Sequence, residues 1–377
     1  MDFSNLAAFL DTLPDAGIPG CDCAVWYDHR PVFRHMSGFA DRKNGRAMAG
    51  NELYFIYSAS KPITCVTAMT LYEKGGFLLN DPLYEYLPEY RHMTVRDENG
   101  EHPAERDITI RDLFTMSAGF EYDLFAGSIA ALRSSNPNFT TREFAREHAK
   151  LPLIFEPGTH FNYSLCHDII GALIEVISGM SFGEYMKKAV LDPIGMKNTG
   201  FRMDDIYPER MAAQYDYDNE TGITSDYALE NSFRAGSSRF ESGGAGLVSC
   251  VDDYILFADM LSAKGLASSG ERILSPSTID LMRTNHLDDT RRLRDFNWQQ
   301  VAGYGYGLGV RTMVDRSASG SAGSVGEFGW DGAAGAYMLA DPERRLAIFY
   351  GQHVLGNRAH VYVHPRIRNI VYSCIDR

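Results

Sequence analysis

The spacing of hydrophobic residues along the 377-residue chain predicts strands near both ends and helices between them. Residues 21–27 and 32–38 at one end, and 335–340 and 346–351 at the other, are apolar or alternating segments bounded by turn residues, as strands are. In the middle, residues 167–178 repeat apolar side chains at helical spacing. We therefore predict an α/β (α+β) fold, in which helices flank an antiparallel sheet built from both termini.

Other segments carry weaker signals of secondary structure. Further helices are expected at 4–13, 58–74, 109–116, 140–151, 182–190, 251–263, 278–283 and 366–374. Thr109 and Thr141 are the expected N-caps of two of them. The glycine-rich segment 304–310 alternates like a strand packed closely against a neighbour.

The order of these elements suggests two interlocked domains. Residues 1–61 and 241–377 are expected to form the sheet domain, and residues 62–240 a mainly helical inserted domain, with the active site in the groove between them.

Composition excludes several classes of function. The net charge is −13 and the lysines and arginines are scattered, so we expect no nucleic-acid partner. No apolar run approaches the roughly 20 residues that span a bilayer, and the N-terminus lacks a signal-peptide pattern, so we expect no membrane partner and a cytoplasmic protein. The six cysteines match neither a disulfide framework nor a zinc motif. The oligomeric state is left open.

The histidines offer one pair at helical spacing. His360 and His364 are four residues apart, but Pro365 is expected to prevent a helix from running through them and forming a metal-binding face. We therefore expect no metal site, and no cofactor is required by the chemistry considered below.

The chemistry of the chain centres on Ser58 and Lys61. If a helix begins at Ser58, Lys61 lies one turn later over the same face. A helix N-terminus and partial burial both favour the neutral amine, which could take the serine proton. One Ser-x-x-Lys is expected by chance in a chain of this length, so the pair alone also fits a capped surface helix.

Two other segments could complete a site. Tyr163 lies between a turn and a predicted helix, where its phenol could relay a proton, although a lone tyrosine is more often a core residue. Residues 329–335, with sequence Gly-Trp-Asp-Gly-Ala-Ala-Gly, precede a predicted strand. Small residues there let a substrate approach backbone N–H groups.

Together these segments resemble a known family. Ser58-x-x-Lys61, Tyr163-Ser164-Leu165 and Trp330-Asp331-Gly332, in this order, are similar to the motifs of the penicillin-recognising serine hydrolases. That family contains class C β-lactamases, D,D-peptidases and family VIII carboxylesterases. The resemblance spans roughly residues 19–350 and implies the β-lactamase/transpeptidase-like fold.

Two departures from the β-lactamase pattern favour the esterase branch. Leu165 stands where the β-lactamases have an asparagine whose amide contacts the substrate. Trp330 stands where they usually have a lysine that attracts the substrate carboxylate. Losing an amide and a cation disfavours an anionic, amide-bearing drug and suits a neutral ester or other small acyl substrate.

The resemblance also implies roles for individual residues. Ser58 would attack the acyl carbonyl, Lys61 and Tyr163 would relay the proton, and the backbone N–H groups of Ser58 and Ala333 would form the oxyanion hole. Which of Lys61 and Tyr163 is the base stays open. The loop 120–137 and the segment 285–300 are expected to shape the pocket. We expect substrate contacts from Trp330, Gly332, Leu165, Tyr122 and Phe125.

Other functions remain possible, both with the same catalytic residues and with different ones. A β-lactamase, a D-amino-acid peptidase or an acyltransferase would use the same acyl-enzyme, and a catalytically silent binding protein would not need all three residues. Gly179-Met180-Ser181-Phe182-Gly183 also matches the nucleophile elbow of α/β-hydrolases. Because the preceding residues have a helical period and Glu184 follows at the right spacing, we interpret Ser181 as a helix cap.

Substitution of the two serines separates these interpretations. We expect Ser58→Ala to abolish turnover of a p-nitrophenyl ester, because the nucleophile is lost, and Ser181→Ala to leave it largely intact. Steady-state kinetics on both variants measures this. The reverse pattern would favour an α/β-hydrolase elbow.

Overall fold

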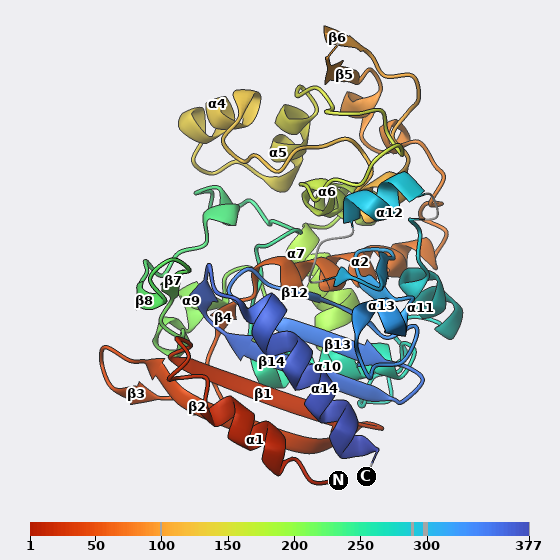
Figure 1. Ribbon diagram of the computed structural model, residues 1–377. Helices are drawn as coiled ribbons and strands as arrows, with labels where there is room; N and C mark the ends of the chain where they lie inside the picture. The colour runs from red at the N-terminus through yellow and green to blue at the C-terminus, as the bar shows by residue number, and fades with distance from the viewer. Residues whose placement is uncertain (99, 288–289, 297–300, 377) are drawn as a thin grey trace.

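An eight-stranded antiparallel sheet forms the centre of the molecule (Figure 1). The structure is a computed structural model that describes residues 1–98, 100–287, 290–296 and 301–376. The strand order is β10-β11-β12-β13-β14-β1-β2-β3, so strands from the two ends of the chain meet where β14 pairs with β1. This confirms the predicted fold class.

The strands of the large sheet come from two parts of the sequence. They are β1 (Gly20–Tyr27), β2 (Arg30–Asp41), β3 (Arg46–Ala47), β10 (Tyr304–Tyr306), β11 (Arg311–Met313), β12 (Phe328–Asp331), β13 (Tyr337–Asp341) and β14 (Leu346–Gln352). Smaller sheets pair β4 (Tyr54–Phe55) with β9 (Val248–Ser249), β5 (Thr94–Asp97) with β6 (Gly100–Pro103), and β15 (Val354–Leu355) with β7 (Tyr215–Asp218) and β8 (Ile223–Asp226). The segment expected to be mainly helical therefore also carries two hairpins, and β7 pairs with a strand near the C-terminus.

Helices surround the large sheet and fill most of the middle of the sequence. The α-helices are α1 (Ser4–Asp11), α2 (Ser60–Tyr72), α3 (Ile110–Phe114), α4 (Gly127–Ser135), α5 (Thr141–His148), α6 (Cys166–Ser178), α7 (Phe182–Met186), α8 (Asp192–Ile194), α9 (Met203–Ile206), α10 (Val251–Ser262), α11 (Pro276–Arg283), α12 (Thr290–Phe296), α13 (Arg316–Ser319) and α14 (His364–Ile375). Short 3₁₀ helices are η1 (Tyr57–Ala59), η2 (Leu83–Glu85), η3 (Pro88–Tyr90), η5 (Pro208–Arg210) and η6 (Ser232–Arg234), and π-helical turns are η4 (Lys187–Leu191) and η8 (Ala359–Val363).

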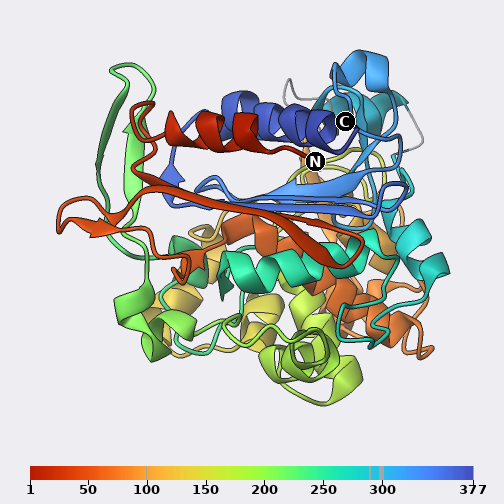
Figure 2. The ribbon, with the colours of Figure 1, turned by 90° about the horizontal axis from the view of Figure 1, so that it is seen from below.

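Side chains of β14 alternate between two hydrophobic layers. Ile348 and Tyr350 belong to a cluster with residues of α1 and α14, whereas Ala347 and Phe349 belong to the large cluster on the other face. Figure 2 shows α1 and α14 side by side on one face of the sheet and most of the helices from the middle of the sequence on the other. Because both faces are covered, β14 is apolar at nearly every position instead of alternating with polar residues.

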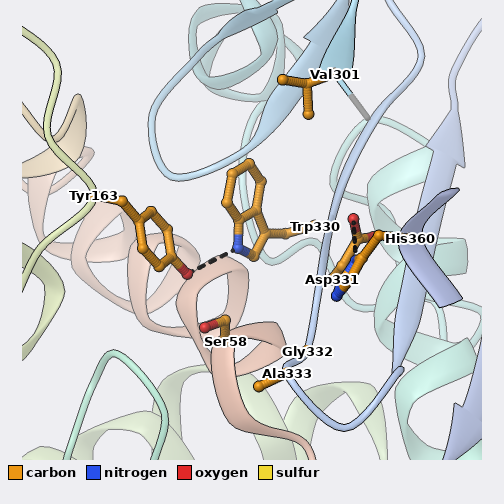
Figure 3. A pocket seen from close by; sticks show the side chains of 8 residues that line it. All are labelled: Ser58, Tyr163, Val301, Trp330, Asp331, Gly332, Ala333 and His360. Atoms are coloured by element: carbon orange, nitrogen blue, oxygen red, sulfur yellow. Dashed lines mark hydrogen bonds and ion pairs between the residues drawn. The ribbon is translucent and has the colours of Figure 1, made fainter. Parts of the chain in front are cut away.

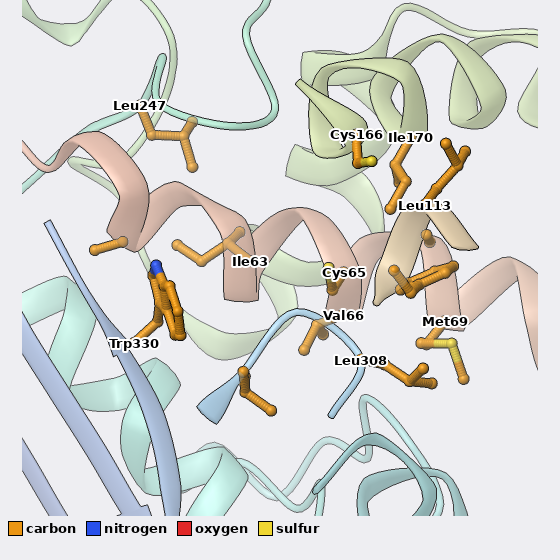
Figure 4. Packing of buried hydrophobic residues seen from close by; sticks show 14 of the residues in the cluster. Ile63, Cys65, Val66, Met69, Leu113, Cys166, Ile170, Leu247, Leu308 and Trp330 are labelled. Carbon is orange, nitrogen blue, oxygen red and sulfur yellow. The ribbon is translucent and has the colours of Figure 1, made fainter. Parts of the chain in front are cut away.

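Helix α2 runs through the core beneath the sheet. Its residues from Ser60 to Leu71 are all buried. Figure 4 shows Ile63, Val66 and Met69 of this helix packed among side chains from α3, α6 and the segment around Leu308. A helix that is enclosed on every side is fixed by its neighbours, so its N-terminal end has a defined position in the molecule.

Several local expectations are corrected by the structure. Thr140, not Thr141, caps α5 through a capping box with Glu143. The loop 120–137 contains helix α4. The expected strand 304–310 ends at Tyr306, because Gly307 N–H bonds to the Val310 carbonyl and Gly309 has a φ of +80°, which turns the chain. Thr109 caps α3 as predicted.

Two further expectations concern the third motif and the C-terminal histidines. The third motif was expected to lie before a strand. Instead, Trp330 and Asp331 are the last two residues of β12, and the rest of the motif forms the turn that leads to β13. Pro365 is the second residue of α14, where a missing N–H costs little, and η8 precedes it directly. Helical structure therefore runs through His360 and His364, and the argument that Pro365 separates them is wrong.

In the described part of the chain, no single helix combines the length and apolar character needed to cross a membrane. Helix α6 and the segment Phe182–Ile194 meet the criterion together, but they are bent by 77° relative to each other.

Candidate active site

Ser58 lies in η1, on a strained turn between β4 and α2. The residue before it, Tyr57, has a φ of +46°, which is uncommon for a residue with a side chain. The Tyr57 ring contacts Phe55 and Phe233, and its hydroxyl donates a hydrogen bond to Gln214 at 3.1 Å. These contacts hold a conformation that costs on the order of 1–3 kcal/mol. The turn places Ser58 on the wall of a cavity.

Lys61 lies one helical turn after Ser58 and is completely buried. Its Nζ donates to the Ser58 Oγ at 3.2 Å and to the Gly244 carbonyl at 2.8 Å. The same Nζ lies 4.5 Å from the centre of the Tyr163 ring and 5.5 Å from that of the Tyr122 ring. These distances satisfy a buried amine and hold it in contact with the serine oxygen.

Asp168 and Gly244 complete the surroundings of Lys61, and neither was assigned a role from sequence. The buried Asp168 carboxylate of α6 accepts hydrogen bonds from Ser242 Oγ at 2.5 Å and from the Gly244 N–H at 3.3 Å. Burial raises the pKa of Asp168, while Ser242 and Lys61 oppose that change. A Cβ on Gly244 would lie 2.7 Å from the Asp168 carboxylate, so this close approach requires glycine. The sequence signal that could have indicated a role for Asp168 is an acidic residue in the first turn of the mainly apolar helix α6.

Tyr163 reaches the cavity from the segment that precedes α6. Its hydroxyl accepts a hydrogen bond from Trp330 Nε1 at 3.2 Å (Figure 3). Its ring stacks between Tyr122, at 5.6 Å between centroids, and Trp330, at 5.7 Å. The following Ser164 is buried and directed to Cys166, so the loop presents the phenol and not the serine to the cavity.

The third motif forms a tight turn beside the serine. Gly332 N–H bonds to the Ala336 carbonyl, and no backbone hydrogen bond among the described residues uses the Ala333 N–H. A Cβ on Gly332 would lie 2.3 Å from the Ile56 carbonyl oxygen, so the turn packs directly against the segment that carries Ser58. Glycine is required for this contact.

The cavity has a volume of about 210 Å³. It is lined by Ser58, Tyr163, Val301, Trp330, Asp331, Gly332, Ala333 and His360. Asp331 and His360 were not predicted to face it. Burial by itself would raise the pKa of Asp331, but the Arg311 guanidinium at 2.8 Å and two nearby histidines bring it below its usual range. The lining thus combines an apolar wall with one ionised carboxylate.

Of the other predicted substrate contacts, the structure places one at the site and two away from it. Tyr122 lies at the site, where its ring stacks on Tyr163; burial raises the pKa of its phenol, and the Ser58 side chain opposes that change. Phe125 does not lie there: its side chain is 61% exposed and lies beneath the Arg133 guanidinium. Leu165 is buried at the start of α6 and lines a different cavity, next to Phe120. The loop 120–137 therefore contributes one aromatic residue to the site and turns the other outward.

The segment 285–300 is described in part. Residues 288–289 and 297–300 lie outside the described residues. The ring of Phe296 in α12 lies 5.3 Å from that of Tyr306 and 6.5 Å from that of Trp330, measured between ring centroids, so Phe296 packs beside the tryptophan that lines the cavity.

Ser181 lies away from this site. Its side chain accepts a hydrogen bond from the Glu184 N–H, and the Glu184 carboxylate bonds back to the Ser181 N–H. This capping box begins α7, as the sequence predicted, and the residues before it are in helix α6 and not in a strand.

Comparison with known proteins agrees with this geometry. Residues 6–371 match the protein family described as Beta-lactamase. Protein Rv1367c of Mycobacterium tuberculosis is 30% identical over 362 residues, which cover 93% of this chain and 90% of that protein. Esterase EstB of Burkholderia gladioli is 27% identical, with 92% and 90% covered. The solved structure of EstCE1, described as a hydrolase with promiscuous acyltransferase activity, superposes with a TM-score of 0.81 at 24% identity, covering 98% of each chain.

The contrasting positions of Tyr122 and Phe125 yield a prediction. We expect Tyr122→Phe to lower kcat/KM for a p-nitrophenyl ester about 10- to 100-fold, because it removes a phenol hydroxyl whose electrostatic interaction reaches Ser58 and whose ring packs beside Lys61 and Tyr163. Phe125→Ala is the matched control from the same loop, and we expect it to change kcat/KM by less than about twofold. Equal effects of the two substitutions would contradict the placement of Tyr122.

Proposed function

The chain belongs to the β-lactamase family, and from this premise we propose that it is a serine hydrolase that cleaves carboxylic esters through an acyl-enzyme on Ser58. The single observation that supports this most strongly is the 3.2 Å contact between the buried Lys61 Nζ and the Ser58 Oγ. A hydroxyl held in contact with an amine can pass its proton to that amine as it attacks a substrate carbonyl.

The first half of the proposed reaction forms the acyl-enzyme. Ser58 Oγ attacks the ester carbonyl carbon while its proton passes to the Lys61–Tyr163 pair. When the tetrahedral intermediate collapses, the bond to the leaving oxygen breaks and the pair returns the proton to the departing alcohol. In the second half, water attacks the acyl-enzyme carbonyl and gives a proton to the same pair. The bond between the acyl carbon and Ser58 Oγ then breaks, the pair returns the proton to Oγ, and the carboxylic acid is released.

The oxyanion is assigned to backbone N–H groups of Ser58 and Ala333. Both residues line the cavity, and they belong to two segments that are packed together through Gly332 and Ile56. Donors held in fixed positions stabilise the developing negative charge without having to reorganise during the reaction.

The lining of the cavity supports a neutral ester over a β-lactam. Trp330 stacks on Tyr163 and presents an apolar ring where the β-lactamase resemblance would place a cation. The nearby Arg311 is already paired with Asp331, so it is not free to attract a substrate carboxylate. The name of the relative EstB, an esterase, is consistent with this choice. An anionic substrate would also meet the ionised Asp331 on the cavity wall.

A substrate panel tests the proposal. We expect p-nitrophenyl butyrate to be hydrolysed with a kcat/KM at least about 100-fold above that for nitrocefin, because the described residues that line the cavity include no lysine or arginine to attract the β-lactam carboxylate. A peptide ending in D-Ala-D-Ala should likewise be a poor substrate. Rapid nitrocefin turnover by the wild-type enzyme, absent from Ser58→Ala, would instead assign the protein to the β-lactamases.

A further inference from the structure

A cluster of three potential metal ligands lies at the side of the catalytic cavity. Asp331, His360 and His364 each offer one ligand atom, and all of these atoms lie within 4.8 Å of one another. Among the described residues, this is the one group of three or more His, Cys, Asp or Glu side chains that meets this condition. Two of the three, Asp331 and His360, also line the cavity with Ser58 (Figure 3).

The two histidines come from consecutive helical turns. His360 lies in η8 and His364 begins α14, so they are four residues apart on one helical face. Their rings are 5.1 Å apart and nearly perpendicular, and both face Asp331 on the neighbouring strand β12. Nδ1 of His360 lies 3.5 Å from one carboxylate oxygen of Asp331, and Nδ1 of His364 lies 3.9 Å from the other.

His364 is set up as a neutral ligand. Its Nε2 bonds to the Gly335 carbonyl at 3.0 Å, so this nitrogen carries the proton and Nδ1 keeps a lone pair. The side chain is 4% exposed, and Nδ1 has no hydrogen-bond partner among the residues that the structure describes. A buried nitrogen lone pair without a partner is costly, and a metal ion would satisfy it.

The surroundings resemble the outer shell of a metal site. Metal-binding histidines usually donate their other N–H to a carbonyl, and metal-binding carboxylates are hydrogen-bonded in turn. Here Gly335 accepts from His364, and Arg311 donates to Asp331 at 2.8 Å. The His364 ring is also stacked on Tyr337 at 4.7 Å, which fixes its orientation.

The positive charge of the Arg311 guanidinium repels a metal ion bound next to Asp331, so it lowers the affinity of the site for that ion. The Arg311 hydrogen bond goes to Asp331 Oδ1, whereas His360 faces Oδ2. An ion held by Oδ2 and the two Nδ1 atoms would leave the arginine pair intact.

We propose that Asp331, His360 and His364 form a binding site for a divalent transition-metal ion such as Zn²⁺. Two imidazoles and one carboxylate suit this class of ion and not Mg²⁺ or Ca²⁺, which prefer oxygen ligands. Three protein ligands leave at least one coordination position open, and two of the three, Asp331 and His360, line the cavity. The site does not depend on ester hydrolysis being the reaction.

Calorimetric titration of the metal-free, untagged protein with ZnCl₂ tests the proposal. We expect one ion per chain, and we expect His360→Ala to weaken its binding by at least about 100-fold, since removing a ligand costs more than the 10- to 100-fold typical of outer-shell changes. His360 is the residue to replace because its side chain is 32% exposed, whereas His364 is buried and Asp331 pairs with Arg311.

His35→Ala is the matched control, because His35 also contacts an aspartate, Asp11 at 2.7 Å, with a side chain 28% exposed. We expect this variant to bind Zn²⁺ within about twofold of the wild type. Zn²⁺ should also raise the unfolding temperature of the wild type and of His35→Ala, but not of His360→Ala, because an ion that binds the folded state stabilises it. Absence of stoichiometric binding, or equal binding by His360→Ala and the wild type, would overturn the proposal.

Discussion

The arrangement of the site depends on the burial of one amine. Lys61 has no exposed surface, and a buried amine is tolerated only when acceptors surround it. One of its partners, Ser58, is three residues away in the sequence. The others are distant: the Gly244 carbonyl belongs to a glycine-rich loop, and the rings of Tyr122 and Tyr163 belong to two further segments. Because all of these groups contact the Lys61 Nζ, burying this amine brings Ser58, the loop at Gly244 and the phenol of Tyr163 together.

The sheet supplies the opposite side of the site. Strand β12 lies between β11 and β13, with a large core cluster on one of its faces, so Trp330 is anchored by the packing of the whole sheet. The turn after β12 has no space for a side chain at Gly332, where it meets the segment leading to Ser58. Rigid contact between sheet and helix therefore fixes the donors proposed for the oxyanion relative to the nucleophile.

The sequence was most informative where the signal was local. The i, i+3 spacing of Ser58 and Lys61, the apolar period of α6 and the capping residues Thr109 and Ser181 depend on neighbours in the chain. Even so, the resemblance, which joined three separate motifs, was needed to choose between an activated serine and a surface cap. Helix α4 was not predicted, because its sequence is polar and lacks a strong period.

Contacts between distant segments were harder to predict. Asp168 is one of two acidic residues in a mainly apolar helix, and its role depends on a loop some 75 positions later, so no spacing rule connects them. Phe125 and Tyr122 are both aromatic residues of one loop. Their neighbours in the fold decide that Tyr122 packs against Tyr163 at the site and that Phe125 faces outward, and the sequence pattern does not distinguish the two. The pairing of His360 and His364 was dismissed because of Pro365, although proline is well tolerated in the first turn of a helix.

The central claim is that Ser58 is the nucleophile. Intact-protein mass spectrometry after treatment with a fluorophosphonate, followed by peptide mapping, tests it directly, because this reagent forms a stable bond with an activated serine. The account predicts one adduct per chain, on the peptide that contains Ser58, and none on the Ser58→Ala variant. An adduct on Ser181, or no adduct on the wild-type protein, would contradict it.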